Sequence, residues 1–566
     1  MAEPGFDRKA AIAELGAPGQ PYEVTTAVVD GTEFRVFANA PENLREVYRS
    51  GREFGDSDFF VYQGERYGYQ ASWELAAQVA NQLLARGVKS GDRVGIALRN
   101  YPEWIWVFMG ITSAGAIAVP MNAWWSGEEL VYGIEDSGLD LLFVDRERLE
   151  RVTPFLNRLE IDLVTVRCQS EEHPDWASFL GNSSVEMPEL EIDPDTNALI
   201  MYTSGYTSRP KGVLSTHRAI VHALLSWESV AVLAAMRSPV PVAEAPVGQV
   251  SMLLAVPLFH VNGLHVQLLS SFRQGRKLVG MYKWDVEEAL RLIEAERISA
   301  LQGVPTMTWE VMRSPNLHKY DTSSLAYVGG GGAAMAPEQA RRIGKNLGSG
   351  VPGTGYGMTE TNALGTTVAG KALLSRPRSC GRPAPPLVSV KIVDERGNEV
   401  PCGESGEIWI HGPMNFRGYW NNPKATSETL TDGWVHTGDI GYMDEADYVF
   451  ITDREKDMVI RGGENIGCQE VEAVLYDHPG VSECAVFGVP DERLGETLAA
   501  VIMRKPGAEI DADAVKAHVA EHLARFKVPE HVWLRQDLLP RIASGKIYKR
   551  GLREEALWAL SKTGSE

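Results

Sequence analysis

The most informative stretch of the sequence is Tyr202-Thr203-Ser204-Gly205-Tyr206-Thr207-Ser208-Arg209-Pro210-Lys211-Gly212, which directly follows an apolar segment, 198–202. The stretch supplies hydroxyl groups, backbone N–H groups free to turn around a glycine, and one lysine. Polyphosphate needs this combination of oriented donors and a point positive charge. It is not a Walker A loop, because Gly212 rather than Ser or Thr follows Lys211. The stretch predicts a phosphate-binding loop after a buried strand, with a solvated Ser/Thr loop as the alternative.

Strand-like and helical patterns alternate on both sides of this loop. A helical pattern at 72–84 precedes a short apolar strand at 93–98, and the loop precedes a helix with apolar positions 220, 221, 224 and 225. Further apolar runs at 251–259 and 326–328 follow, the second ending in four glycines, 329–332. Such alternation is typical of α/β layers around largely parallel sheets.

A dense charge cluster, Asp453-Arg454-Glu455-Lys456-Asp457, separates two apolar strands and predicts an exposed connection. We place a domain boundary there, giving an N-terminal domain at 1–453 and a C-terminal domain at 454–566. The second part predicts a helix at 470–476, strands at 484–489 and 498–503, and a helix capped by Asp511. The expected fold class is therefore α/β: a large N-terminal region of packed α/β subdomains plus a small α+β C-terminal domain.

Length and charge limit the function further. The chain has 566 residues and a net charge of −20, with 44% apolar and 23% charged residues, so it is a globular protein of more than one domain. Nucleic-acid binding is not expected, because it needs a clustered positive surface. The five cysteines are scattered without metal-binding or disulfide spacing. With no apolar signal segment at the N-terminus, a cytoplasmic protein is expected.

The uncharged segment 104–127 is about as long as a membrane span. It contains Gly110, Gly115, Pro120 and Asn122, however, so a helix of small residues running into a buried strand is the favoured interpretation. We therefore expect no membrane span.

Seven further motifs follow the loop in order: Pro257-Leu258-Phe259-His260-Val261-Asn262-Gly263, Gly331-Gly332-Ala333-Ala334-Met335, Tyr356-Gly357-Met358-Thr359-Glu360, Gly433-Trp434-Val435-His436-Thr437-Gly438-Asp439, Asp453-Arg454, Arg461-Gly462-Gly463-Glu464-Asn465 and Ser544-Gly545-Lys546. With them the sequence resembles the adenylate-forming superfamily of acyl-CoA synthetases, peptide-synthetase adenylation domains and beetle luciferases. The resemblance spans nearly the whole chain and implies the adenylate-forming enzyme fold, with an N-terminal AMP-binding domain at 1–453 and a C-terminal mobile domain at 454–566.

The resemblance implies that a carboxylate attacks the α-phosphorus of ATP, releases pyrophosphate, and is then passed as an acyl group from AMP to a thiol. It assigns the phosphates to the loop, and Mg²⁺ to Thr203 and Glu360, whose oxygens suit a hard cation. The nucleotide-binding residues that it implies are Thr203, Ser204, Gly205, Tyr206, Thr207, Lys211, Gly332, Ala333, Ala334, Tyr356, Gly357, Thr359, Asp439 and Arg454. Among these, Tyr356 would stack on adenine, and Asp439 and Arg454 would bind the ribose.

By the same resemblance, Lys546 is the catalytic lysine that bridges the acyl carboxylate and the α-phosphate, although an exposed surface lysine is the alternative. Lys456 would be the hinge about which the small domain rotates between the two half-reactions. Gly463 would then face the tunnel for coenzyme A. His260 resembles the aromatic gate between acid pocket and tunnel, the alternative being a hydrogen-bonded core histidine.

The acid pocket implied by the resemblance includes His260, Val261, Val304, Gly330 and Met358. The stretch 259–264 carries no acidic residue that could pair with an amino group, so the substrate is expected to be a fatty, cyclic or aryl acid without an α-amino group. Only twenty residues follow Lys546, too few for a carrier domain, so free coenzyme A is the expected acceptor.

The loop departs from the family pattern at Tyr206 and Ser208, where Ser or Thr and Gly are usual. Ser208 adopts positive φ less readily than glycine does. We hypothesise that Tyr206 narrows the loop and weakens or slows ATP binding. The variant Tyr206→Thr should then change the ATP KM or kcat in steady-state assays, and unchanged constants would contradict the idea.

Three other functions stay open from the sequence. The acyl group could pass to an amine or a carrier protein, or the chain could be a luciferase-like oxygenase. A non-catalytic nucleotide-binding homologue is the third, since fold alone does not fix activity. Association into a homodimer is also left open.

Overall fold

The computed structural model describes residues 6–203, 210–237, 248–333, 335–454, 458–461, 464–491, 494–542 and 545–563. At positions 237, 453, 454, 460, 464, 465 and 563 it describes the backbone alone. The predicted sites Ser204, Gly205, Tyr206, Thr207, Ala334, Lys456 and Gly463 lie outside these residues, as does the hypothesis about Tyr206 and Ser208.

The strand before the predicted phosphate loop, β9 (Asn197–Tyr202), lies inside a seven-stranded sheet of order β20-β10-β9-β6-β5-β7-β8. Strands β5 to β9 are parallel. Strand β10 pairs with β9, and β20 pairs with β10, both in the antiparallel direction. The other members are β5 (Arg93–Ala97), β6 (Ile117–Pro120), β7 (Leu141–Val144), β8 (Asp162–Thr165), β10 (Gly212–Thr216) and β20 (Gly418–Tyr419).

A nine-stranded sheet carries the glycine-rich motif and has the order β17-β16-β15-β14-β13-β11-β12-β3-β4. Its inner strands, from β15 to β3, are all parallel, as the alternating pattern predicts. Its strands are β3 (Asp58–Tyr62), β4 (Glu65–Gly68), β11 (Ser251–Leu254), β12 (Lys277–Gly280), β13 (Ala300–Gly303), β14 (Tyr327–Gly331), β15 (Val351–Tyr356), β16 (Thr366–Ala369) and β17 (Arg382–Pro383).

Three smaller sheets complete the strands. The N-terminal hairpin consists of β1 (Val24–Val29) and β2 (Thr32–Phe37). A five-stranded sheet contains β18 (Ser389–Val393), β19 (Gly406–His411), β21 (Leu430–Thr431), β22 (Trp434–Met443) and β23 (Val449–Arg454). The C-terminal sheet contains β24 (Val459–Arg461), β25 (Glu464–Ile466), β26 (Val481–Asp491), β27 (Gly495–Arg504) and β28 (His531–Arg535).

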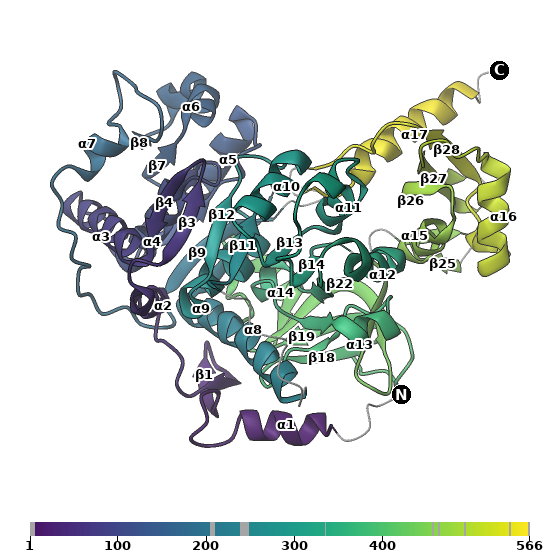
Figure 1. The fold of residues 1–566 in the computed structure, drawn as a ribbon, viewed down its shortest axis with the longest axis horizontal. Helices are drawn as coiled ribbons and strands as arrows, with labels where there is room; N and C mark the ends of the chain where they lie inside the picture. Colours follow the sequence, from purple (N-terminus) through teal and green to yellow (C-terminus); the bar gives the residue numbers. More distant parts are fainter. Residues whose placement is uncertain are drawn as a thin grey trace.

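Helices cover the faces of these sheets (Figure 1), and the largest buried apolar cluster joins α2, α3, α4, α8 and η3 to strands of both large sheets. The α-helices are α1 (Arg8–Leu15), α2 (Leu44–Gly51), α3 (Tyr69–Ala85), α4 (Pro102–Ser113), α5 (Gly127–Ser137), α6 (Arg146–Val152), α7 (Trp176–Leu180), α8 (His217–Arg237), α9 (Ser270–Gln274), α10 (Val286–Ala295), α11 (Pro305–Arg313), α12 (Pro337–Asn346), α13 (Gly370–Ser375), α14 (Pro423–Thr429), α15 (Cys468–Asp477), α16 (Ala512–His522) and α17 (Lys549–Thr563). The 3₁₀ and π segments are η1 (Arg52–Phe54), η2 (Thr153–Arg158), η3 (Asn262–Leu269), η4 (Leu317–Lys319), η5 (Thr359–Thr361) and η6 (Arg525–Lys527).

Most predicted elements are confirmed. The uncharged segment 104–127 forms most of α4 and then β6, both fully buried, as the non-membrane interpretation requires. The prediction of a helix directly after the phosphate loop is wrong, because β10 lies between loop and helix. This short strand is stabilised by pairing with both β9 and β20, a tertiary effect that a local pattern does not reveal.

Among the described residues, one helix is apolar and long enough to span a membrane by composition. It is the 217–236 part of α8. An 18-residue window of this helix has a mean hydropathy of 1.7, and 61% of that window is buried inside the protein. Its apolar residues belong to the main buried cluster, where α8 packs against α2, η3 and β10.

The C-terminal elements form a separate small unit at one side of the molecule, seen in yellow-green and yellow in Figure 1. Its apolar cluster includes Val515 and Val519 of α16, and the Asp511 carboxylate caps that helix by accepting from the Ala514 N–H at 2.8 Å. The predicted boundary between 453 and 454 falls at the end of β23, and it stays a prediction.

Candidate active site

The two ends of the phosphate loop are held together by the β9–β10 hairpin. The Thr203 N–H donates to the Lys211 carbonyl at 3.0 Å, and the Lys211 N–H donates to Thr203 Oγ1 at 3.4 Å. Thr203 and Lys211 therefore face each other where the loop leaves the sheet.

Glu360 lies close to this hairpin. It sits in η5, is 6% exposed, and its Oε1 accepts a hydrogen bond from the Tyr419 hydroxyl at 2.6 Å. Lys211 Nζ lies 4.7 Å from the centroid of the Tyr419 ring. Burial and then the Glu360 carboxylate raise the pKa of Tyr419, so this phenol stays a donor. The lysine and the carboxylate thus meet at Tyr419, a residue that the sequence motifs do not single out.

A second pair of predicted residues meets where β15 and β22 approach each other. The Tyr356 hydroxyl donates to Asp439 Oδ2 at 2.5 Å, and Asp439 is 5% exposed. The Asp439 N–H donates to Thr437 Oγ1 at 3.1 Å, which fixes the carboxylate relative to the strand. Burial and the carboxylate raise the pKa of Tyr356 well above its usual value. Arg454 lies opposite Asp439 in the β22–β23 register.

Glycines keep the carboxyl end of β14 open. A Cβ on Gly330 would lie 1.9 Å from the Gly303 carbonyl oxygen, so only glycine fits there. Gly332 has a φ of +81°, a conformation that glycine adopts without strain. A Cβ placed on Gly332 would lie 3.6 Å from Cε and 4.0 Å from Nζ of Lys546. The lysine of the small unit therefore reaches the glycine-rich end of the large sheet, and Ala333 lies exposed beside it.

The segment that carries Lys546 is fastened at several points. The Arg541 guanidinium donates to the Gly545 carbonyl at 3.0 Å and to Glu483 Oε1 at 2.5 Å. The Thr306 hydroxyl, at the start of α11, donates to the same Gly545 carbonyl at 3.4 Å. The Arg541 contacts fix the segment within the C-terminal unit, and the Thr306 contact holds it against the large unit. Lys546 is therefore not an unattached lysine on the surface.

His260 lies beside this lysine. Burial, together with the charge of Lys546, lowers the pKa of His260 to about 4, so the imidazole is neutral at pH 7. Its ring lies 4.8 Å from that of Phe259. Its Nε2 is buried and has no hydrogen-bond partner among the described residues, so a fully hydrogen-bonded core histidine is not what the structure shows.

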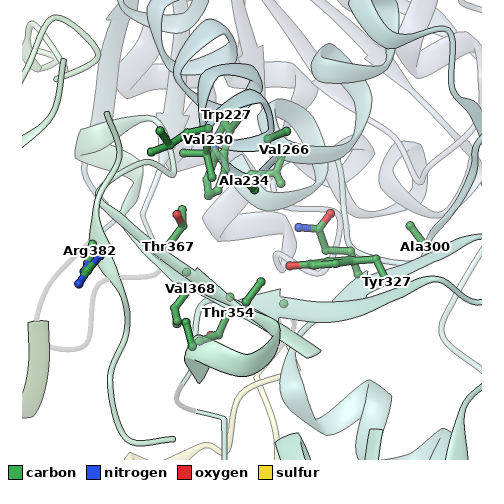
Figure 2. Close-up of a pocket in the computed structure, with 18 of the residues that line it drawn as sticks. Trp227, Val230, Ala234, Val266, Ala300, Tyr327, Thr354, Thr367, Val368 and Arg382 are labelled. Carbon is green, nitrogen blue, oxygen red and sulfur yellow. The ribbon is translucent and has the colours of Figure 1, made fainter. Parts of the chain in front are cut away.

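A cavity of about 1110 Å³ opens from the glycine-rich end of β14 and extends under α8. Figure 2 shows Trp227, Val230, Ala234 and Val266 on its helical side, facing Thr354, Thr367 and Val368 of the sheet. No aspartate or glutamate is among the described residues that line it.

Only part of the predicted acid pocket lines this cavity. Val261 and Gly330 do, together with Gly332 and Gly357 of the predicted nucleotide set. His260, Val304 and Met358 do not: His260 lies beside Lys546, Val304 packs against Gly545 of the lysine segment, and Met358 packs against the cluster around Phe416 and Tyr419. Thr359 begins η5 next to Glu360.

Two protein-family models match this chain. The family model described as AMP-binding enzyme matches residues 47–420, and the model described as AMP-binding enzyme C-terminal domain matches residues 470–546.

Individual relatives cover most of the chain. A feruloyl-CoA synthase from an Amycolatopsis species is 37% identical over 480 residues, which span 84% of this chain and 91% of that protein. A long-chain-fatty-acid–CoA ligase from Bacillus subtilis is 32% identical over 536 residues, 89% of this chain and 93% of that protein. The crystal structure of ATP-bound MatB from Rhodopseudomonas palustris is 29% identical, with a TM-score of 0.78 over 91% of this chain and 99% of that one.

Proposed function

Because this chain belongs to the AMP-binding enzyme family and is an acid–thiol ligase that makes an acyl-adenylate and then an acyl-CoA, we propose that it binds its acid in the cavity under α8. The proposed acid is fatty, cyclic or aryl and has no α-amino group. The observation that carries this proposal is the continuity of the apolar cavity with Gly330–Gly332, beside Lys546. A lining without carboxylates supports an acid without an ammonium group.

The proposed adenylation step uses the residues that surround this junction. Thr203 and Lys211 would hold the outer phosphates of ATP, and Asp439 the ribose, with the Tyr356 ring beside it. Lys546 would neutralise the negative charge that develops between the acid carboxylate and the α-phosphate, the kind of fixed charge that stabilises a transition state. Since His260 is neutral, it would add no second positive charge there.

We propose Mg²⁺ as the accompanying cation. The buried Glu360 carboxylate beside Tyr419 and the nearby Thr203 hydroxyl offer the hard oxygen ligands that Mg²⁺ prefers. The ion would neutralise phosphate charge when bound. Glu360 is in turn oriented by the Tyr419 hydroxyl.

The thiol step is proposed to follow a rotation of the C-terminal unit about Lys456, which would bring Gly463 to the coenzyme A tunnel gated by His260. The domain boundary at 453/454 and a cytoplasmic location are part of the same proposal. An observation in favour of such a rotation is that the polar contacts between the two units are single side-chain contacts, which include Thr306 with the Gly545 carbonyl, Arg313 with Ser482 and Arg378 with Asp477.

A panel of fatty, cyclic and aryl acids tests the proposal. Purified enzyme with ATP, Mg²⁺ and coenzyme A should release AMP and form thioester with members of the panel, and should exchange labelled pyrophosphate into ATP when acid is present. Exchange without thioester would indicate a different acceptor. Absence of acid-dependent exchange with every acid would contradict the proposed function.

Asp439→Asn should raise the KM for ATP by about tenfold, because a charged hydrogen-bond acceptor is replaced by a neutral one. The KM is measured by acid-dependent pyrophosphate release. Tyr356→Phe is the matched control: it keeps the aromatic ring and removes only the hydroxyl that bonds Asp439 Oδ2, so its effect should be smaller. An unchanged ATP KM in Asp439→Asn would argue against a ribose contact.

A further inference from the structure

One end of the cavity under α8 is polar, although its walls are largely apolar. Arg276, Ser270, Ser299 and Tyr327 lie there, at the amino ends of the parallel strands. Arg276 directly precedes β12, and Tyr327 begins β14. The glycines and Lys546 lie at the opposite, carboxyl end of β14. Tyr327 and Gly331 are four residues apart on this strand, about 13 Å at 3.3 Å per residue.

Arg276 forms no ion pair with a described residue, although the Glu228 carboxylate lies near enough to act on its charge. Among the described residues no carboxylate forms an ion pair with it, and its one hydrogen bond from the side chain goes to Ser270 Oγ at 3.3 Å. The nearby Glu228 carboxylate is used by Arg273, at 2.6 Å, and by the Tyr22 hydroxyl, at 3.5 Å. Burial lowers the pKa of Arg276. A partly buried guanidinium with one hydrogen bond of 3.3 Å is incompletely paired, and a ligand that supplies an anion or a strong acceptor would complete its pairing.

The arginines at the other side of the cavity contact an aromatic ring, a carboxylate or a carbonyl of the protein. Arg382, labelled at the far side in Figure 2, stacks on Tyr448 with its guanidinium carbon 4.2 Å from the ring centroid. Arg376 stacks on the same ring and also pairs with Asp444 at 3.2 Å. Arg8 donates to the Pro383 carbonyl. Arg8 and Arg376 thus bond to oxygens of the protein, whereas Arg382 contacts the Tyr448 ring and its buried Nε has no hydrogen-bond partner among the described residues.

Tyr327 supplies a second donor beside Arg276. Its ring lies across the glycines of β14 and β15: a Cβ on Gly353 would be 2.3 Å from the Tyr327 hydroxyl, and a Cβ on Gly329 would be 2.7 Å from it. Figure 2 shows the hydroxyl directed along the sheet into the cavity. Among the described residues it makes no hydrogen bond, whereas the Ser299 hydroxyl is used by Ser251 and the Ser270 hydroxyl by Val266. Burial raises the pKa of Tyr327 to about 12, so the phenol remains protonated.

We propose that the acid substrate carries a second oxygen acceptor, a carboxylate or a carbonyl, at the end remote from its reacting carboxyl group, and that Arg276 and Tyr327 bind it. This inference rests on the proposed function, since it takes the acid to lie along β14 with its reacting end beside Lys546. Arg276 then determines specificity without touching the reacting atoms. The apolar walls hold the middle of the molecule.

Matched acids test this proposal. Decanedioic acid, decanoic acid and an oxo-acid of the same length are compared in two ways: by kcat/KM for thioester formation, and by calorimetric binding to the wild-type protein. Decanedioic acid should exceed decanoic acid roughly tenfold in both, the effect expected for a hydrogen bond to a charged group. Equal or better use of decanoic acid by the wild type would overturn the inference.

The outcomes separate the two claims. Turnover of these acids without a preference for a remote oxygen would overturn this inference and leave the proposed function standing. If no acid is turned over, the proposed function fails, and the calorimetric comparison still decides whether the remote oxygen is recognised. The oxo-acid shows which property of the remote oxygen is recognised. If the oxo-acid exceeds decanoic acid in kcat/KM and in binding as much as decanedioic acid does, hydrogen bonding is responsible. If it exceeds decanoic acid by less, the charge of the second carboxylate contributes, and either result supports the proposal.

Variants test the residue itself. Arg276→Met should abolish the preference for decanedioic acid, Arg276→Lys should keep part of it, and Arg291→Met, on the exposed side of α10, should leave it unchanged. The Tm of Arg276→Met should be equal to or above that of wild type, because an incompletely paired, partly buried charge has been removed. A lowered Tm with an unchanged preference would show a structural role for Arg276 and overturn the assignment.

Discussion

Lys546→Ala should lose adenylate formation by roughly 10²- to 10³-fold, the range found when one fixed group that stabilises developing charge is removed. Lys546 Nζ lies beside Gly332, where the cavity for the acid opens, so the variant removes positive charge at the reacting end. Transfer of the acyl group from synthetic acyl-adenylate to coenzyme A should continue, because the lysine is expected to leave the site before that step. Pyrophosphate exchange measures the first half-reaction, and thioester formation from the synthetic adenylate measures the second.

Lys562→Ala is the matched control for this prediction. Lys562 belongs to the same C-terminal unit, and its Nζ lies 3.8 Å from the centroid of the exposed Trp558 ring. Both half-reactions should stay at wild-type rates in the control. Equal loss of both half-reactions in Lys546→Ala would contradict the assigned role.

Gly331→Val should reduce kcat/KM for long or bulky acids by roughly 10- to 100-fold, while small acids such as acetate are much less affected. The glycine lines the cavity, and an added Cβ would meet only the Gly355 carbonyl oxygen, at 3.2 Å. The two methyl groups of valine would therefore occupy cavity space at the mouth, and overpacking of this size costs about 1–3 kcal/mol. Competition between a long and a short acid for thioester formation measures the change.

Gly331→Ala provides the graded comparison, because it adds the Cβ without the methyl groups and should show a smaller change in the same direction. The ATP KM should stay near the wild-type value in both variants. If Gly331→Val lowered activity equally with long and short acids, the cavity would not be the acid site.

Much of the fold follows from local signals in the sequence. Three features are predictable: the strand before the predicted phosphate loop, the alternation of parallel strands with helices, and the helix capped by Asp511. The periodicity of apolar residues and the capping of helices both act within a few residues of sequence. Strand β10 is not: its five residues become a strand through pairing with β9 and with β20, about 200 residues later in the chain.

The residues of the candidate site also fall into those that the sequence predicts and those that it does not. Motifs indicate Thr203, Glu360, Asp439 and Lys546, because each motif is a continuous run of sequence. The partners that orient them, such as Tyr419, come from distant elements and carry no local signal. The cavity is similar, because residues of α8, η3 and six strands of the nine-stranded sheet line it. The sequence alone therefore could not exclude Val304 and Met358 from its lining, nor include Arg276 and Tyr327.

The most direct test of the account is the stoichiometry of a complete reaction with an acid that fits the cavity. With ATP and coenzyme A, we predict one AMP, one pyrophosphate and one acyl-CoA for each acid consumed, measured together by mass spectrometry and a coupled pyrophosphate assay. Release of ADP and phosphate in place of AMP and pyrophosphate, or AMP release that does not depend on acid, would contradict it.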